Sequence, residues 1–188
     1  MGSHDGAQLN FDKPVLGFSA YSGTGKTTLL EKLLPLMKLQ GLRVAMIKQT
    51  HHDFDIDKPG KDSYRLRKAG AGQMLIASDR RCALMTEFEE TKDQGLNSLL
   101  ARLDLEAVDL ILVEGFRHLP FPKIELHRPS TGKPLIFPGD DSVIAVATDD
   151  FIDTGNLPML NINVPEEVMG FINRWLESLS EVGLPTDG

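Results

Sequence analysis

The clearest pattern in the chain is a series of short apolar runs that alternate with amphipathic stretches. Residues 15–20 and 109–113 are apolar runs bounded by polar turns, which is typical of strands buried in a parallel sheet. Residues 26–40 and 165–179 carry apolar side chains at helical spacing. Further strands are predicted at 42–48, 143–147 and 159–162. This alternation predicts an α/β fold of the P-loop NTPase type, with a mainly parallel sheet flanked by helices.

The middle of the chain departs from this alternation. Residues 72–78 and 82–87 predict two strands around a turn, and residues 123–127 alternate as an antiparallel or edge strand does. We therefore expect an antiparallel extension within 72–88 and 117–137. Short helices are expected at 96–103 and at 62–68, the latter capped by Asp62 or Ser63.

Two local features add to this pattern. Pro35 lies inside the predicted helix 26–40, and because a mid-helix proline costs about 3 kcal/mol, we expect a kink or a break there. Cys82 is the only cysteine, so an internal disulfide is excluded and a reducing cytoplasm is favoured. Its place in an apparent strand favours a small core residue over a reactive thiol.

Length and charge bound the class of protein. The chain has 188 residues and a formal net charge of −7, which suits one domain and argues against a nucleic-acid partner. We expect a disordered or tag-derived segment at 1–12, a nucleotide-binding domain at 13–179 and a loose tail at 180–188. No stretch is apolar over the ~18 residues that a membrane span needs.

A turn of small residues joins the first predicted strand to the first predicted helix. Residues 20–27, AYSGTGKT, match the phosphate-loop pattern G-x-x-x-x-G-K-[ST], except that Ala20 replaces the first glycine. Its glycines let the backbone approach an anion, and the helix N-terminus points N–H groups at it. We predict that Lys26 neutralises the outer phosphates and that the Thr27 hydroxyl binds Mg²⁺. The predicted nucleotide-binding residues here are Ser22, Gly23, Thr24, Gly25, Lys26, Thr27 and Thr28.

A second candidate site is the end of the most apolar strand, VDLILVEGF at 108–116, where the run stops at Glu114. A charge beside a core costs several kcal/mol unless it is paired, so we expect either Mg²⁺ or Lys26 to pair with it. Glu114 is therefore predicted to serve the metal and catalysis. The alternative is an ordinary strand end that reaches solvent. Gly115 permits an unusual backbone turn there.

A third cluster, KQTHHDFDIDKPGKDS at 48–63, is rich in histidine and aspartate. It is a transition-metal site, a solvated loop, or a loop that senses the γ-phosphate and holds Mg²⁺. For the last alternative, Asp53 is the best candidate, as a metal ligand and as the group that positions the attacking water. Lys61 and Arg65 are candidates for contact with phosphate or a partner.

Together, SGTGKTTLLEKLL, IKQTHHDFDIDKPGKDSYRLRKAGA and DLILVEGF resemble the molybdopterin-guanine dinucleotide biosynthesis protein B (MobB) family. The resemblance runs from about Pro14 to Trp175, and the histidine-rich block is its most specific part. It implies a homodimeric GTP-binding protein with Mg²⁺ and weak GTPase activity. It also implies an adapter role beside a MobA-type guanylyltransferase, with molybdopterin or its guanine dinucleotide as the ligand of the pathway.

The sequence leaves the base and the reaction open. There is no N-K-x-D guanine-reading motif; Asp149, after the predicted strand 143–147, is the nearest candidate, and Asn161 and Asn163 are weaker ones. The absence of a G-x-G-x-x-G fingerprint favours a nucleoside triphosphate over NAD. Two alternatives to the adapter GTPase remain. One is a small-molecule kinase that uses the same loop, and the other is a binder of the dinucleotide that hydrolyses nothing.

Overall fold

The computed structural model describes residues 11–50, 54–90 and 94–181. Its contacts divide the chain into two units. One comprises the chain up to Gln49 and from Leu96 onward, and the other comprises Thr50–Gly95. The nucleotide-binding domain expected at 13–179 spans both units. Each unit is described by itself below.

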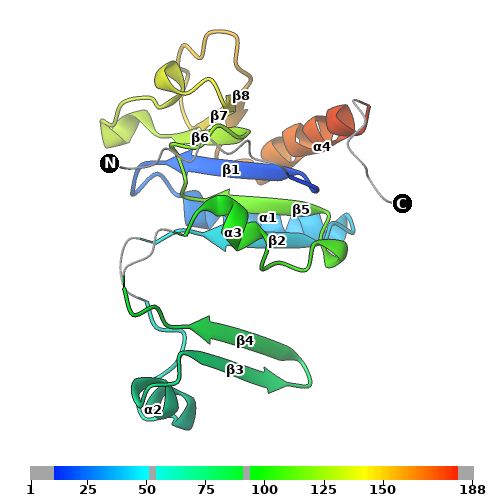
Figure 1. Ribbon diagram of the computed structural model, residues 1–188. Coiled ribbons are helices and arrows are strands. Elements are labelled where there is room, and N and C mark those ends of the chain that lie inside the picture. Colours follow the sequence, from blue (N-terminus) through cyan, green and yellow to red (C-terminus); the bar gives the residue numbers. More distant parts are fainter. Residues whose placement is uncertain (1–10, 51–53, 91–93, 182–188) are drawn as a thin grey trace. The chain divides into compact units, whose positions relative to one another are not determined.

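A six-stranded parallel sheet forms the centre of the larger unit, with the strand order β2-β5-β1-β6-β7-β8 (Figure 1). This confirms the α/β class. β1 is central, so the turn that follows it lies between neighbouring strand ends, where ligands of such sheets bind. The strands are β1 (Val15–Ala20), β2 (Val44–Lys48), β5 (Leu110–Glu114), β6 (Lys123–His127), β7 (Val143–Thr148) and β8 (Met159–Asn161).

Two cores cover the faces of this sheet. On one face, α1 (Lys26–Leu39) and α4 (Pro165–Glu181) pack with fully buried side chains such as Leu33 and Ile172. On the other face, α3 (Leu96–Leu100) packs with apolar residues of the connection between β5 and β6, including Phe116 and Phe121. Short 3-10 turns lie at Leu105–Ala107, Pro129–Thr131 and Phe137–Gly139.

The predicted break of the first helix is wrong, because α1 runs without interruption through Pro35. Pro35 lies on the exposed side of the helix. The carbonyl of Glu31, which loses its usual N–H partner to the proline ring, is therefore on the side that water reaches. Packing of the opposite side against the sheet offsets the remaining cost.

The antiparallel or edge assignment of residues 123–127 is also wrong. β6 pairs in parallel with β1 and β7 and is buried along its whole length. The alternation that suggested a solvent face comes from Lys123 and Glu125, which are buried and form hydrogen bonds with neighbouring loops. Among the described strands, only β3 and β4 of the smaller unit pair antiparallel, so the expected antiparallel extension is found within 72–88 and not within 117–137.

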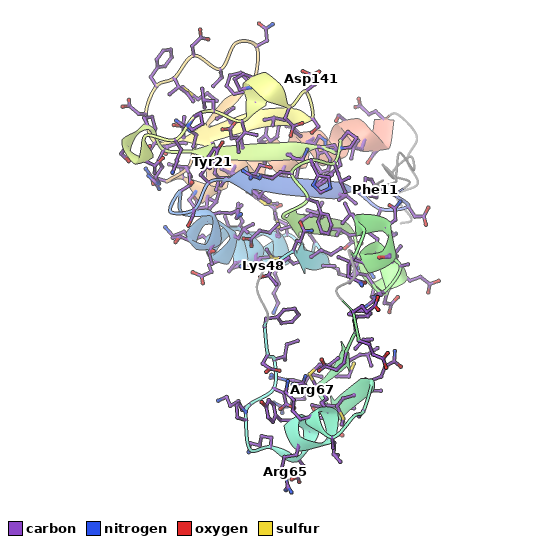
Figure 2. All side chains as sticks on the ribbon, turned by 60° about the vertical axis from the view of Figure 1, so that its left-hand side comes forward. Phe11, Tyr21, Lys48, Arg65, Arg67 and Asp141 are labelled. Carbon is purple, nitrogen blue, oxygen red and sulfur yellow. The ribbon has the colours of Figure 1, made fainter. Side chains whose placement is uncertain are left out.

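The smaller unit contains α2 (Asp62–Lys68) and an antiparallel hairpin of β3 (Gln73–Ser78) and β4 (Arg81–Thr86). Arg67 is its main buried polar group and forms ion pairs with Asp55 (2.5 Å) and with Glu87. Figure 2 shows Arg67 on the inner side of α2, whereas Arg65 points outward. Two details differ from expectation. Lys61 is the N-cap residue of α2 and forms no side-chain cap, and Cys82 is exposed.

Candidate functional site

The phosphate loop lies between β1 and α1. Gly23 and Gly25 have φ angles of 85° and 93°, a left-handed conformation that a residue with a Cβ rarely adopts. Gly25 is the N-cap of α1 and its carbonyl accepts the bond from the N–H of Leu29 at 3.0 Å. The loop therefore has the backbone that an anion nest requires, followed directly by a helix N-terminus.

The residues of the loop divide into buried and exposed groups. Thr24 is buried, and its hydroxyl donates to the carbonyl of Tyr21 at 2.5 Å, so this side chain holds the loop in shape. Ser22, Thr27 and Thr28 are exposed at the mouth of the loop. The predicted phosphate and Mg²⁺ ligands are thus accessible.

Glu114 lies beside the loop, at the carboxyl end of β5. Its carboxylate contacts the Nζ of Lys26 at 3.1 Å and the Nζ of Lys48 at 3.4 Å, and its side chain is only 15% exposed. Of the two partners expected for Glu114, Mg²⁺ or Lys26, the structure shows the contact with Lys26. The register explains the geometry, because Glu114 lies opposite Phe18 of β1 and Lys48 of β2, so three strand ends converge.

The backbone after Glu114 is unusual and held by Gln49. Gly115 has a φ of 107°, and Phe116 has a φ of 51°, a left-handed conformation that is an outlier for a bulky residue. The Gln49 side-chain oxygen accepts the N–H of Phe116 at 3.0 Å, and the Gln49 N–H donates to the carbonyl of Glu114 at 2.8 Å. This arrangement fixes Glu114 relative to the end of β2.

Arg128 is the residue of this site that the sequence did not reveal. Its guanidinium donates to the carbonyl of Thr24 (2.9 Å), to Asp149 (2.5 Å) and to Asn163 (2.9 Å). It thereby joins the phosphate loop to the ends of β7 and β8, where the candidate base-reading residues lie. The sequence shows an arginine directly after a strand. To connect this arginine with the phosphate loop, one must know that β6 lies beside β1.

The site offers part of the oxygen ligand set that Mg²⁺ prefers. Thr27 and Glu114 supply hard oxygen ligands, which Mg²⁺ prefers, and Mg²⁺ usually completes its shell with phosphate and water. Within residues 11–50, 54–90 and 94–181, no group of three histidine, cysteine or acidic side chains could hold a metal by itself. Asp53, with His51 and His52, lies outside the described residues. Asp55, from the same segment, is paired with Arg67.

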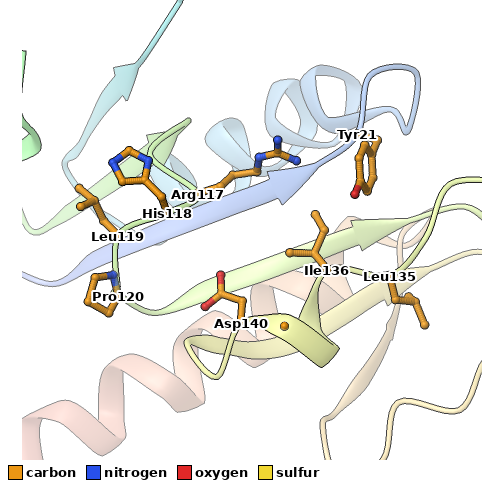
Figure 3. A pocket seen from close by; sticks show the side chains of 9 residues that line it. Tyr21, Arg117, His118, Leu119, Pro120, Leu135, Ile136 and Asp140 are labelled. Atoms are coloured by element: carbon orange, nitrogen blue, oxygen red, sulfur yellow. The ribbon is translucent and has the colours of Figure 1, made fainter. Parts of the chain in front are cut away.

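A pocket of about 540 Å³ opens next to the loop, on the side of Tyr21 (Figure 3). Its other walls are residues 117–120, which follow Glu114-Gly115-Phe116, and residues 135–140, which precede β7.

A helix long and apolar enough to cross a membrane is not found in the part of the chain that the structure describes.

The fold and the loop define a P-loop-like α/β protein with an added antiparallel hairpin. The chain belongs to the family described as molybdopterin guanine dinucleotide synthesis protein B, MobB, whose model matches residues 15–149. Two proteins named molybdopterin-guanine dinucleotide biosynthesis adapter protein are similar to it. The one from Escherichia coli is 48% identical over 165 residues, covering 87% of this chain and 94% of the relative. The one from Haemophilus influenzae is 44% identical over 169 residues, covering 89% and 92%.

Solved structures agree with the fold. A crystal structure of molybdopterin-guanine biosynthesis protein B superposes with a TM-score of 0.68 at 26% identity, over 87% of this chain and 99% of the other. Bacillus subtilis MobB superposes with a TM-score of 0.69 at 22% identity, over 86% and 96%, which supports the fold alone.

Proposed function

We propose that the protein is a GTP-binding adapter with weak Mg²⁺-dependent GTPase activity in molybdopterin guanine dinucleotide synthesis. The contact between Lys26 and Glu114, at 3.1 Å beside the phosphate loop, carries the proposal. The Glu114 carboxylate holds Lys26 beside the anion nest. When Mg²⁺ and a triphosphate bind, the carboxylate would turn to Mg²⁺ and the lysine to the phosphates. Relatives named as adapters in this pathway supply the biological setting.

In this proposal the roles divide along the edge of the sheet. Lys26 and the loop N–H groups bind the phosphates, and Thr27 and Glu114 hold Mg²⁺ as Lys26 turns to the phosphates. The bound metal neutralises charge on the phosphate oxygens. Asp53 positions the attacking water. Weak turnover is consistent with this set, because related hydrolases gain about 10³–10⁵-fold in rate from an added arginine.

The base-reading role belongs to Asp149 in this proposal. Its carboxylate can accept bonds from guanine N1 and N2, and it lies at the end of β7, two strands away from β1 in the sheet order. Arg128 holds one carboxylate oxygen of Asp149 at 2.5 Å and contacts Asn163 at 2.9 Å. These contacts support a base site at this end of the sheet, joined to the phosphate loop through Arg128.

A homodimer is part of the proposal, and the smaller unit supports it. Its hairpin carries exposed large apolar residues, including Leu75 (63% exposed) and Leu84 (60% exposed). A two-stranded hairpin alone is marginally stable in water, and exposed apolar patches of this kind mark interaction surfaces. A second copy of the chain is the proposed partner there. A MobA-type guanylyltransferase and molybdopterin or its guanine dinucleotide are the proposed partners of the assembled protein.

Separate titrations with GTP, ATP and the guanine dinucleotide test the proposal, with Mg²⁺ present and phosphate release followed in parallel. We expect GTP to bind most tightly and to be hydrolysed slowly. Lys26→Ala should weaken GTP binding by about two orders of magnitude or more, because charge-assisted bonds to phosphate are lost. Lys32→Ala, an exposed residue of the same helix, is the control. Unchanged GTP affinity in Lys26→Ala would refute the assignment.

The kinase alternative has one supporting observation, which is the pocket beside Tyr21. A kinase requires an acceptor site next to the terminal phosphate, and this pocket lies beside the loop. Phosphate transfer to a small acceptor that is faster than hydrolysis would favour a kinase over the adapter GTPase.

A further inference from the structure

The pocket beside Tyr21 is built from three separate segments of the larger unit. Tyr21 belongs to the phosphate loop, residues 117–120 follow β5, and residues 135–140 precede β7 (Figure 3). Its volume of about 540 Å³ lies within the ~300–1,000 Å³ typical of small-molecule sites. The phosphate loop contributes only Tyr21, so the pocket is adjacent to the triphosphate site and distinct from it.

Buried charged side chains of β6 fix two of the walls. The Lys123 ammonium, 1% exposed, donates to the carbonyl of Leu119 at 2.6 Å and to Asp140 at 2.9 Å, so it links the second segment to the third. Glu125 is fully buried and accepts the N–H groups of residues 136–137, each at 2.8 Å. Burying such charges is unfavourable unless they are paired or hydrogen-bonded. Here they hold the walls in one arrangement before any ligand binds.

A strained backbone conformation lies directly before the pocket wall formed by residues 117–120. Phe116 is the one non-glycine residue with a positive φ in the described part of the chain, and Gln49 holds its N–H. A conformation of this kind is strained, and such strain tends to occur at functional sites. Arg117 and His118 follow directly and line the pocket.

The lining indicates the chemistry of the ligand. The Arg117 guanidinium lies 5.5 Å from the centre of the Tyr21 ring, and no carboxylate of residues 11–50, 54–90 or 94–181 pairs with it. The one carboxylate of the lining, Asp140, is paired with Lys123, so the pocket carries a net positive charge. The rest of the lining comprises His118, Gly139 and an apolar surface formed by Leu119, Pro120, Leu135 and Ile136. An anionic group and a flat, partly apolar body match this surface.

We propose that this pocket binds a phosphorylated planar heterocycle of about the size of a pterin, at the same time as a nucleotide occupies the phosphate loop. Arg117 binds the phosphate, and Tyr21 and the apolar wall contact the ring. The choice of a pterin rests on the proposed function, whereas the pocket and its preference for an anion do not.

The test is a fluorescence titration of the full chain with 6-hydroxymethylpterin phosphate. Arg117→Met removes the charge and keeps the stem. Gly139→Leu places a side chain in the pocket. A Cβ at Gly139 would have no atom within 4 Å, and the φ of Gly139 is not left-handed, so the backbone tolerates the change. We expect each variant to weaken binding at least about tenfold, the effect of one charge-assisted bond or more. Arg174→Met, an exposed residue of α4, is the matched control and should change binding less than about twofold.

Lys26→Ala separates this proposal from the proposed function. It should weaken GTP binding by about two orders of magnitude or more and leave the affinity for the pterin phosphate unchanged. The two pocket variants should weaken binding of the pterin phosphate and leave the affinity for GTP unchanged. No binding at millimolar probe, equal affinity in all pocket variants, or displacement of the probe by GTP would overturn the proposal. Equal binding of the pterin without its phosphate, or displacement by inorganic phosphate at the same concentration, would also overturn it.

Discussion

Replacement of Gly115 by alanine tests whether the backbone after β5 is what holds the site together. An added Cβ would lie 2.6 Å from the Cβ of Gln49 and 3.1 Å from its Oε1. The first of these atoms is next to the backbone, so Gln49 must move. A left-handed φ costs a residue with a Cβ about 1–2 kcal/mol. Overpacking adds about 1–3 kcal/mol, and the lost bond from Phe116 to Gln49 adds about 1 kcal/mol.

The expected loss of stability is therefore about 3–6 kcal/mol, a large share of the ~5–15 kcal/mol of a typical domain. Urea unfolding followed by circular dichroism measures it. With a slope of ~2 kcal/mol per molar urea, the midpoint should fall by about 1.5–3 M. GTP binding should weaken as well, because the N–H of Gln49 holds the carbonyl of Glu114 at 2.8 Å.

Gly132→Ala is the matched control for this prediction. Gly132 also has a left-handed φ, 64°, but a Cβ there meets nothing within 4 Å. Its replacement should cost only the backbone strain, about 1–2 kcal/mol. If the two variants unfold at the same urea concentration, the close approach of Gly115 to Gln49 does not matter, and the reasoning is refuted.

Three further predictions follow from other contacts. Arg128→Lys should reduce the preference for GTP over ITP, measured by calorimetry, because a lysine cannot hold Asp149 while it contacts the loop; an unchanged ratio would contradict the role of Asp149. Glu125→Gln should lower the unfolding free energy by about 1–3 kcal/mol, because its amide group offers an N–H to a backbone donor; stability equal to wild type in urea would contradict this. The hydrogen bond from Arg43 lowers the pKa of Asp109 to about 2, so this pair contributes its full stability above about pH 4. Acid titration of the unfolding free energy should show this contribution lost as the pH falls toward 2. Asp109→Asn should not show that loss.

Local sequence was sufficient for the phosphate loop and for Glu114. The loop combines a strand, two glycines, a lysine and an amphipathic helix within residues 15–39, so its geometry depends on neighbours in the chain. Glu114 was recognisable because a charge ended the most apolar run. A buried charge needs a partner; Mg²⁺ and Lys26 were the two expected ones, and the structure shows Lys26. The loop and the charged strand end were recognisable from patterns within a few residues, whereas the contact between Lys26 and Glu114 joins distant parts of the chain.

The buried, parallel position of β6 could not be predicted from local sequence. Its alternation of charged and apolar residues has the same period whether the charged side faces water or a set of buried partners. The partners of Lys123 and Glu125 come from loops 117–122 and 134–142, whose positions depend on the assembled sheet. Without them, an edge strand was the simpler interpretation, and the pocket that these loops form could not be predicted.

The sequence by itself thus determined the fold class, the phosphate loop and the carboxylate beside it, because short-range patterns of burial and backbone freedom specify them. Only the tertiary structure decided which residues connect the loop to the rest of the site. The bond from Arg128 to Thr24 joins residues 104 positions apart, and it exists because β6 lies beside β1. The order of strands in a sheet depends on the packing of the whole chain, and no local pattern encodes it.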